Sequence, residues 1–344
     1  MSGGAPISTA DERIVLAHGG GGELTQRLVA ERFLPKLGNA LLSPLTDSAV
    51  MDLPAGRAAM TTDAYVVQPL EFPGGDIGRL AVCGTVNDLA VMGARPLALS
   101  LAMILEEGLE LAVLDRIVDS IAAAAAEAGV VVATGDTKVV ERRRGDGLMI
   151  ATAGIGEMTG DVRQGPGRIR AGDVLLINGP IAEHGLAVMS AREGLRFETD
   201  LRSDVAPLNG LIAGLLACGA DVRWMRDATR GGLAAVAADI AEASGLSVEL
   251  DEAAIPMTRT ARHASELLGL DPLLVANEGK VVVVVPDSDA APALAAMRDH
   301  PLGRHAAIIG RVTEARPAVV ELATRAGGRR LVQRPYGEEL PRIC

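Results

Sequence analysis

Aromatic residues are scarce in this chain: Phe, Trp and Tyr together make up 2% of its 344 residues, although 49% of the residues are hydrophobic. Any hydrophobic core must therefore be packed from Ala, Val, Leu and Ile. Basic residues are outnumbered by acidic ones, 33 to 44, which gives a formal net charge of −11. Nucleic-acid-binding proteins need a basic surface and usually stacking aromatic side chains, so this composition argues against that class. It does not exclude a phosphate ligand, because acidic side chains hold phosphate through Mg²⁺.

Cysteine is also rare, and its distribution indicates the compartment. Cys83, Cys218 and Cys344 are far apart and odd in number, which favours a reducing environment over a disulfide framework. The first residues lack the charged-then-apolar pattern of a signal peptide, and no uncharged apolar run is long enough to span a bilayer. We therefore expect a cytoplasmic protein, long enough for two domains with hydrophobic cores.

The chain ends on a cysteine, in a segment where chains are usually loose and solvated. Free cysteine is one of the residue types most often buried, so the position is unusual. Pro335, Gly337 and Pro341 make a regular helix or central strand improbable there. Residues 334–344 are predicted to form a flexible tail with a thiol at its tip. By itself, this segment leaves open a chance exposed cysteine on a frayed end.

Strand and helix patterns alternate through both halves and predict an α/β or α+β fold. The predicted helices cover residues 23–37, 77–92, 111–128, 181–193, 208–218, 233–243, 289–298 and a stretch after Pro256 through Leu268. The predicted strands cover 59–63, 97–105, 130–136, 174–180, 281–285 and segments near 306–313, 317–323 and 329–333. Glycine, proline and charge cluster in residues 158–173, the best candidate boundary. We predict domains at 13–160 and 161–333 after a disordered N-terminus, 1–12.

Short acidic side chains recur beside small residues in the first half. Asp63 ends a predicted strand, Asp136 follows a strand pattern that breaks at a glycine, Asp47 follows Thr46, and Asp88 lies inside a helical pattern. Hard oxygen ligands with room for water and phosphate are what a Mg²⁺–phosphate site requires. A single Asp is better explained as a helix cap or turn residue. Four such placements favour a shared site.

Two glycine-containing segments are candidates for phosphate binding. Residues 19–22 are four glycines that open a predicted helix, where backbone N–H groups can meet a phosphate; a mobile linker is the commoner explanation of such a run. The P-loop pattern is absent from the chain. In the second half, Asp227 and Thr229 offer oxygens, and Arg230 with the following glycines can hold phosphate.

Three further side chains have open interpretations. Lys138 is either an exposed lysine or a catalytic cation beside a phosphate site. Glu278, between an Asn and a Gly, is either a turn residue or a carboxylate that faces the first domain's site. His184 is interpreted as a capping or surface histidine, with a ligand-facing role as the alternative.

In order, these segments resemble the ATP-dependent PurM-like superfamily, which includes aminoimidazole ribonucleotide synthetase, selenophosphate synthetase and thiamine-monophosphate kinase. Within it, nearly the full chain is similar to the HypE family, the carbamoyl dehydratases of hydrogenase maturation. The most specific mark is the terminal Pro341-Arg-Ile-Cys344, joined to His18–Gly22, Gly135–Lys138 and Asn277–Gly279. Many relatives carry paired acids where this chain has Thr46-Asp47, which affects the ligand count there.

The resemblance implies a homodimer of two-domain PurM-like subunits, with the N-terminal sheets at the dimer core, and the cofactors ATP and Mg²⁺. The implied metal ligands are Asp47, Asp63, Asp88 and Asp227. The implied nucleotide-binding residues are Gly19, Gly20, Gly21, Gly22, Asn87, Asp136, Thr229 and Arg230. The implied catalytic residues are Cys344, Lys138 and Glu278.

In the family's reaction, the terminal cysteine receives a carbamoyl group from the carbamoyltransferase HypF. ATP-dependent dehydration makes a thiocyanate, whose cyanide passes to the HypC–HypD iron scaffold for the [NiFe]-hydrogenase centre. Two alternatives stay open. One is another superfamily enzyme, of the selenophosphate synthetase or small-molecule kinase type; the former usually places a reactive Cys in the glycine loop, which here holds only His18 and glycines. The other is a non-catalytic, nucleotide-switched carrier.

Overall fold

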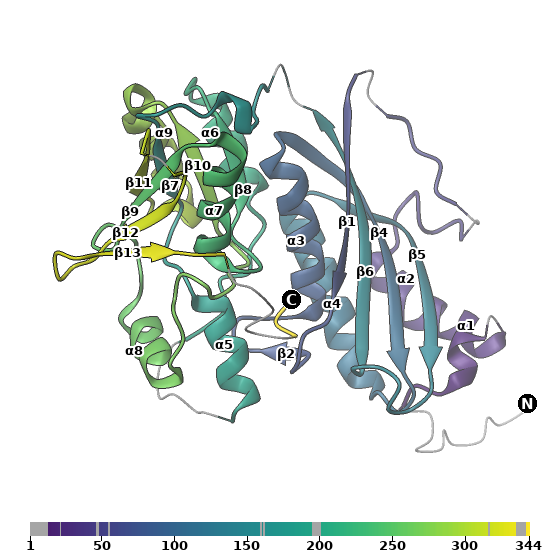
Figure 1. The fold of residues 1–344 in the computed structure, drawn as a ribbon. Helices are drawn as coiled ribbons and strands as arrows, with labels where there is room; N and C mark the ends of the chain where they lie inside the picture. Colours follow the sequence, from purple (N-terminus) through teal and green to yellow (C-terminus); the bar gives the residue numbers. More distant parts are fainter. Residues whose placement is uncertain are drawn as a thin grey trace, which may run out of the picture.

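The computed structural model describes residues 13–20, 22–45, 48–53, 56–158, 160, 162–194, 201–315, 317–334 and 342–344. The predicted disordered N-terminus, Gly21, Asp47 and residues 335–341 of the predicted tail lie outside this description. The described chain forms a four-stranded and a seven-stranded sheet, with helix α3 (Ile77–Val91) between them (Figure 1).

The four-stranded sheet has the order β1-β6-β4-β5. Its strands are β1 (Ala58–Tyr65), β4 (Ala94–Glu106), β5 (Val131–Val140) and β6 (Leu148–Met158). The parallel pair β4–β5 is joined by helix α4 (Leu111–Ala128), because parallel neighbours need a crossover connection. The buried side chains of α4 recur every three or four residues, and the helix ends at Gly129 in the left-handed region (φ 70°).

A helical segment at the N-terminal end packs into the same core. It consists of α1 (Glu23–Leu28), a π turn (Val29–Phe33) and α2 (Leu34–Leu37), as the predicted helix 23–37 required. Leu28, Phe33 and Leu37 are its buried side chains. Lys36 forms an ion pair with Asp119 of α4 (2.9 Å), which ties the segment to that helix.

The seven-stranded sheet has the order β13-β12-β9-β11-β7-β10-β8. All neighbouring pairs are antiparallel except β9–β12. The strands are β7 (Val174–Ile177), β8 (Trp224–Asp227), β9 (Ser247–Asp251), β10 (Val281–Val285), β11 (Ala307–Thr313), β12 (Val320–Ala323) and β13 (Arg329–Val332). Helices α6 (Asn209–Ala217) and α9 (Ala290–Asp299) share one core with this sheet, and α7 (Gly232–Ser244) shares another. The remaining described elements are α5 (Glu183–Arg192), α8 (Arg259–Leu268) and the small β2–β3 hairpin (Glu71–Phe72 and Gly75–Asp76).

Helix α3 fixes the two sheets relative to each other. It contacts β1, β4 and β6 on one side and α6 and β8 on the other, and nearly all of its residues are buried. Hydrogen bonds cross the junction from Arg79 Nε to Val205 O (3.1 Å) and from Asn209 Nδ2 to Ala128 O (2.8 Å). Side chains on β1, α3 and β8 are therefore held in a defined arrangement.

Most predicted elements are confirmed, but two predicted strand ends are wrong. β5 continues through Gly135 to Val140. Glycine fits at position 135 within the sheet, because a Cβ atom there would lie 2.7 Å from Leu101 O. Asp136 therefore lies within a strand. β1 likewise extends past Asp63 to Tyr65. Strands β6, β8 and β9 were not predicted. β8 and β9 are short, and the apolar pattern of β6 is interrupted by glycine and alanine. None of the helices in the described ranges is long and apolar enough to cross a membrane.

Candidate active site

Three carboxylates meet where the two sheets face each other. Asp63 comes from β1, Asp88 from α3 and Asp227 from the end of β8. The pKa of Asp88 is raised from 3.8 to about 7, because burial disfavours the charged form and because Asp227 and Asp63 repel it. Thr61 Oγ1 donates to Asp88 Oδ2 (2.8 Å), and the Tyr65 hydroxyl donates to Asp63 Oδ2 (3.0 Å). The arrangement concentrates negative charge in a partly buried place.

Such a cluster fits a divalent cation bound together with phosphates. In the described part of the chain, no three Asp, Glu, His or Cys side chains could by themselves hold a metal ion. Mg²⁺ in nucleotide sites normally uses only one or two carboxylates and takes its other ligands from phosphate oxygens and water. Asp63, Asp88 and Asp227 meet that smaller requirement. The fourth predicted ligand, Asp47, lies outside the described residues.

Glu278 lies beside these carboxylates and is almost completely buried, at 2% exposure. Its Oε1 atom has no hydrogen-bond partner in the described structure. Burial raises the pKa of Glu278 well above its usual value, and the charges of Asp204, Asp227 and Asp63 raise it further, while Arg230 opposes them. A buried carboxyl group with an unused oxygen is suited to exchange a proton with a ligand.

The turn that carries Glu278 is held from two directions. Asp204 accepts hydrogen bonds from the backbone N–H groups of Glu278 and Gly279 (both 3.1 Å) and from Lys280 Nζ (2.8 Å). Asn277 Oδ1 accepts from the Ala182 N–H (2.7 Å), and Asn277 Nδ2 donates to Ala228 O (2.8 Å). No local pattern indicates the Asp204–Lys280 pair, since the two residues lie far apart in the chain.

The last residue of the chain lies at this site. An interaction with Cys344 is the main cause that raises the pKa of Arg230, and the charges of Asp63 and Glu278 add to it. The side chain of Ile343 is 2% exposed and belongs to the hydrophobic core of the first half. Figure 1 shows the chain end between the sheets, near α3 and α5. The C-terminal residue, which carries the thiol, is thus placed among the predicted catalytic and metal-binding side chains. We name this group the tail site: Asp63, Asp88, Asp227, Arg230, Glu278 and Cys344.

A second group of predicted residues lies elsewhere. Asp136 and Lys138 are exposed on β5, which is the opposite edge strand from β1. Three strand spacings separate those edges, roughly 14 Å. Gly19 packs on the same strand, where a Cβ atom would lie 2.4 Å from Val139 N. Gly19, Asp136 and Lys138 therefore form a β5-edge group, which a single chain does not bring to Cys344.

Two predictions need correction. Asn87, predicted to contact nucleotide, is buried and joins the two halves: its Nδ2 donates to Ala206 O (3.1 Å), and its Oδ1 accepts from the Leu208 N–H (2.7 Å). His184, interpreted as a capping or surface residue, is fully buried, and its Nε2 bonds to Ile343 O (2.9 Å). Thr229 stays beside Asp227, where its hydrogen bond lowers the pKa of that carboxyl group against the larger effect of burial.

Comparison with known proteins identifies the lineage of this arrangement. Residues 45–158 match the N-terminal domain, and residues 170–322 the C-terminal domain, of AIR synthase related proteins. The chain is 50% identical to the carbamoyl dehydratase HypE of Cupriavidus necator over 340 residues, which cover 98% of this chain and 97% of the relative. A solved structure of HypE in complex with ATP matches with a TM-score of 0.92 and 46% identity, covering 96% and 99% of the two chains. The structure of a HypE–HypF complex matches with a TM-score of 0.78 and 45% identity, covering 90% and 99%.

Proposed function

Since the chain belongs to the HypE family of carbamoyl dehydratases within the AIR synthase related proteins, we propose that it dehydrates an S-carbamoyl group on its own Cys344 to a thiocyanate. ATP is the co-substrate, and the product supplies the cyanide ligands of the [NiFe]-hydrogenase iron centre. One observation carries the proposal: the C-terminal residue lies inside the protein, beside Arg230 and close to Glu278 and the carboxylates.

The reaction replaces a poor leaving group with a good one. The γ-phosphoryl group of ATP is transferred to the carbamoyl oxygen, which then departs as phosphate while the nitrogen loses two protons and forms the C≡N bond. The products are the Cys344 thiocyanate, ADP and phosphate. Asp63, Asp88 and Asp227 would hold Mg²⁺, which offsets the charge of the triphosphate when it is bound. A HypE relative has been solved with ATP, which supports the same nucleotide here.

Glu278 is the proposed proton acceptor. Its raised pKa makes it a stronger base than a solvated carboxylate once it has lost its own proton. Arg230 lowers the pKa of Glu278, and so would any cation that neutralises the neighbouring acids. Arg230 is also placed to stabilise negative charge on the carbamoyl oxygen. The cationic ligands would thus favour the deprotonated form of Glu278, which is the form that accepts a proton.

The β5-edge group takes part through a second subunit in this proposal. We propose a homodimer in which the four-stranded sheets pack together, so that Lys138, Asp136 and the glycine run of one subunit reach the tail site of the other. The sheet face opposite α3 supports this arrangement, because alternate residues of β1 are exposed on it, including Met60 at 78%. Lys138 would then orient the carbamoyl group, and the glycines would contact phosphate.

The tail must exchange with partners as well. We propose that HypF loads Cys344, as the solved HypE–HypF complex supports, and that a HypC–HypD scaffold receives the cyanide. Both encounters take place in the cytoplasm in this proposal. They require residues 334–344 to move as a unit that is separate from the two domains, at 13–160 and 161–333. A kinase of this superfamily would not need a terminal cysteine docked at this site, and a carrier would not need Glu278 as a buried base.

Mass spectrometry of the C-terminal peptide tests the proposal. After carbamoylation, addition of Mg²⁺ and ATP is expected to remove the mass of one water from the Cys344 adduct, with one ATP consumed per adduct. Cys344→Ala should abolish the product and leave ATP binding intact. An adduct that stays carbamoylated while ATP is hydrolysed would refute the dehydration, and full activity after removal of the tail would favour a kinase.

A further inference from the structure

The main chain next to Cys344 is held by three side-chain and backbone donors. The carbonyl of Arg342 accepts from Arg192 Nη2 (2.6 Å) and from the backbone N–H of Gln68 (3.1 Å). The carbonyl of Ile343 pairs with His184 Nε2 (2.9 Å). His184 and Arg192 stand at the two ends of α5, so one helix supports two successive peptide groups of the tail.

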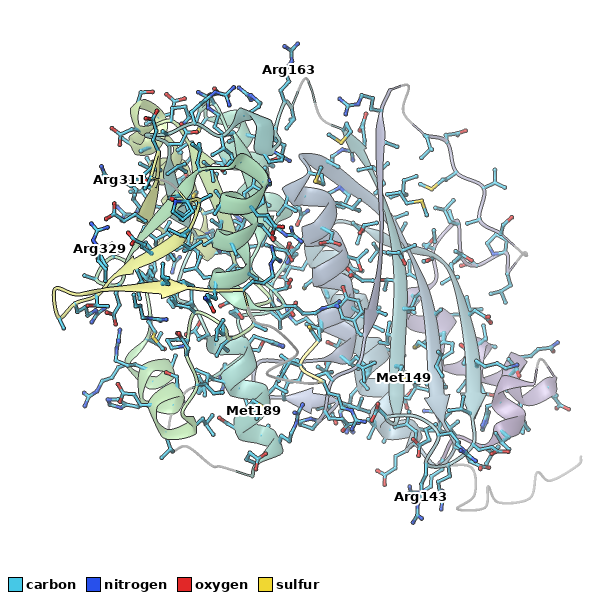
Figure 2. The ribbon with its side chains drawn as sticks, viewed as in Figure 1. Arg143, Met149, Arg163, Met189, Arg311 and Arg329 are labelled. Atoms are coloured by element: carbon cyan, nitrogen blue, oxygen red, sulfur yellow. The ribbon has the colours of Figure 1, made fainter. Side chains whose placement is uncertain are left out.

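The side chain of Ile343 is buried at the same place. It belongs to a buried cluster that includes Val188 of α5 and Ala276, next to the turn of Glu278, and Met189 is packed against this cluster. Figure 2 shows Met189 on α5, the helix that lies beside the chain end. An ion pair from Arg342 Nη1 to Asp146 Oδ1 (3.2 Å) holds the preceding residue at the surface. The protein therefore binds the tail through groups of the tail itself: two main-chain carbonyls, one apolar side chain and one charged side chain.

The hydrogen bonds of His184 define its proton position. A carbonyl oxygen only accepts, so Nε2–H donates to Ile343, and Nδ1 is left to accept from Ser203 Oγ (2.8 Å). The Phe72 ring packs edge-on against the imidazole, with 5.4 Å between the ring centroids. Ser203 adjoins Asp204, which holds the turn of Glu278. The short segment Ser203–Asp204 therefore supports both His184, which holds the tail, and the turn that carries the proposed base.

We propose that His184, Arg192 and the buried side chain of Ile343 form a tail clamp, which places Cys344 beside Arg230, in the group of side chains that includes Glu278. His184 and Arg192 are positioning residues, because they contact the tail's main chain and not the reacting group. None of the clamped atoms changes when the thiol is carbamoylated, so the clamp holds the loaded and the unloaded tail alike. This inference rests on the proposed function for its role, but its structural part can be tested without any activity.

Alkylation kinetics test the clamp in the unmodified protein. Cys344 is labelled with iodoacetamide, and the rate is followed by mass spectrometry of its peptide in wild type, Arg192→Ala, His184→Gln and Ile343→Asp. Loss of one hydrogen bond is expected to speed labelling about fivefold, and a buried aspartate at 343 by at least about tenfold. Arg311→Ala is the matched control, since Arg311 is exposed on β11, at the outer side of the seven-stranded sheet (Figure 2). Cys83, which is buried with its pKa raised to about 12, reports unfolding if it becomes labelled.

Single-turnover dehydration then tests the positioning role. In clamp variants that were carbamoylated to the same extent, the rate of water loss should fall in proportion to the docked fraction of the tail, so Ile343→Asp should lose the most, with unchanged ATP affinity. Wild-type labelling rates in folded Arg192→Ala and Ile343→Asp would overturn the clamp, and so would wild-type turnover in a variant whose labelling shows the tail to be mostly undocked. If the wild type shows no dehydration, the proposed function fails, and the labelling result still decides whether the clamp exists. Arg192→Ala and Ile343→Asp keep the test valid even if His184→Gln does not fold.

Discussion

Replacing Asp88 by asparagine should make the metal-free protein more stable while it removes the activity. The substitution keeps the shape of the side chain and an oxygen that accepts the hydrogen bond from Thr61 (2.8 Å in the native protein). It removes one of three negative charges that meet with Asp63 and Asp227. Most substitutions of buried residues destabilise a protein, so a gain in stability would indicate that the three carboxylates repel one another in the wild type.

The size of the effect follows from the pKa. An unfolded Asp88 loses its proton near 3.8 and the folded one near 7, so the folded state binds more protons between these values. Stability therefore falls as the pH rises from about 4 to 7, and the penalty is complete above 7. A shift of about 3 pKa units corresponds to about 4 kcal/mol at most. Because solvent screens the charge of this partly buried group, we expect a gain of about 1–2 kcal/mol above pH 7.

Urea unfolding of wild type and Asp88→Asn at pH 5 and pH 8, without divalent cations, measures this difference. The gain should be larger at pH 8, and saturating Mg²⁺ with ATP should reverse the order of stability, since only the wild type keeps the cation site intact. Asp52→Asn is the matched control, because Asp52 is exposed. A variant that is less stable than wild type at pH 8, or a gain that does not grow with pH, would refute the reasoning.

Three further predictions follow from the same site. Asp204→Asn should cost about 3–5 kcal/mol in urea unfolding, because it leaves buried Lys280 unpaired, and Asp204→Leu with Lys280→Met should recover most of that loss. Glu278→Gln should retain ATP binding in calorimetry and lose dehydration; a variant that keeps turnover would exclude Glu278 as the base. Mixing Lys138→Met and Cys344→Ala subunits should restore about a quarter of the wild-type sites if Lys138 acts across the dimer, and none if it acts within its own chain.

Local patterns were sufficient for most of the fold. The apolar repeat of α4 and the five valines of β10 can form little else, and both elements appear where they were predicted. The errors arose where backbone pairing, and not the pattern of side chains, determines where a strand ends. Gly135 interrupts the hydrophobic pattern of β5 but not its pairing with β4, so the sequence placed a strand end where the structure has none.

The candidate site was predictable only in part, and for a physical reason. A carboxylate beside small or polar residues is visible locally, so Asp63, Asp88, Asp227 and Glu278 could all be named from the sequence. What places them is long-range: the Asp204–Lys280 pair joins residues 76 apart, and the His184–Ile343 contact joins residues 159 apart. The separation of the β5-edge group from the tail site was equally hidden, since it depends on the strand order of the sheet.

The strength of the tail's contacts fits a segment that must enter and leave. Burial of Ile343 stabilises the docked state by about 2 kcal/mol, and three hydrogen bonds to the two carbonyls add about 3 kcal/mol. Ordering residues 342–344 costs about 3–6 kcal/mol, so the docked state is favoured by about 2 kcal/mol at most. A tail held in this balance spends time inside for dehydration and outside for loading. If the clamp bound the thiol itself, modification of the thiol would change the free energy of docking. Because it binds the main chain, this free energy stays the same throughout the cycle.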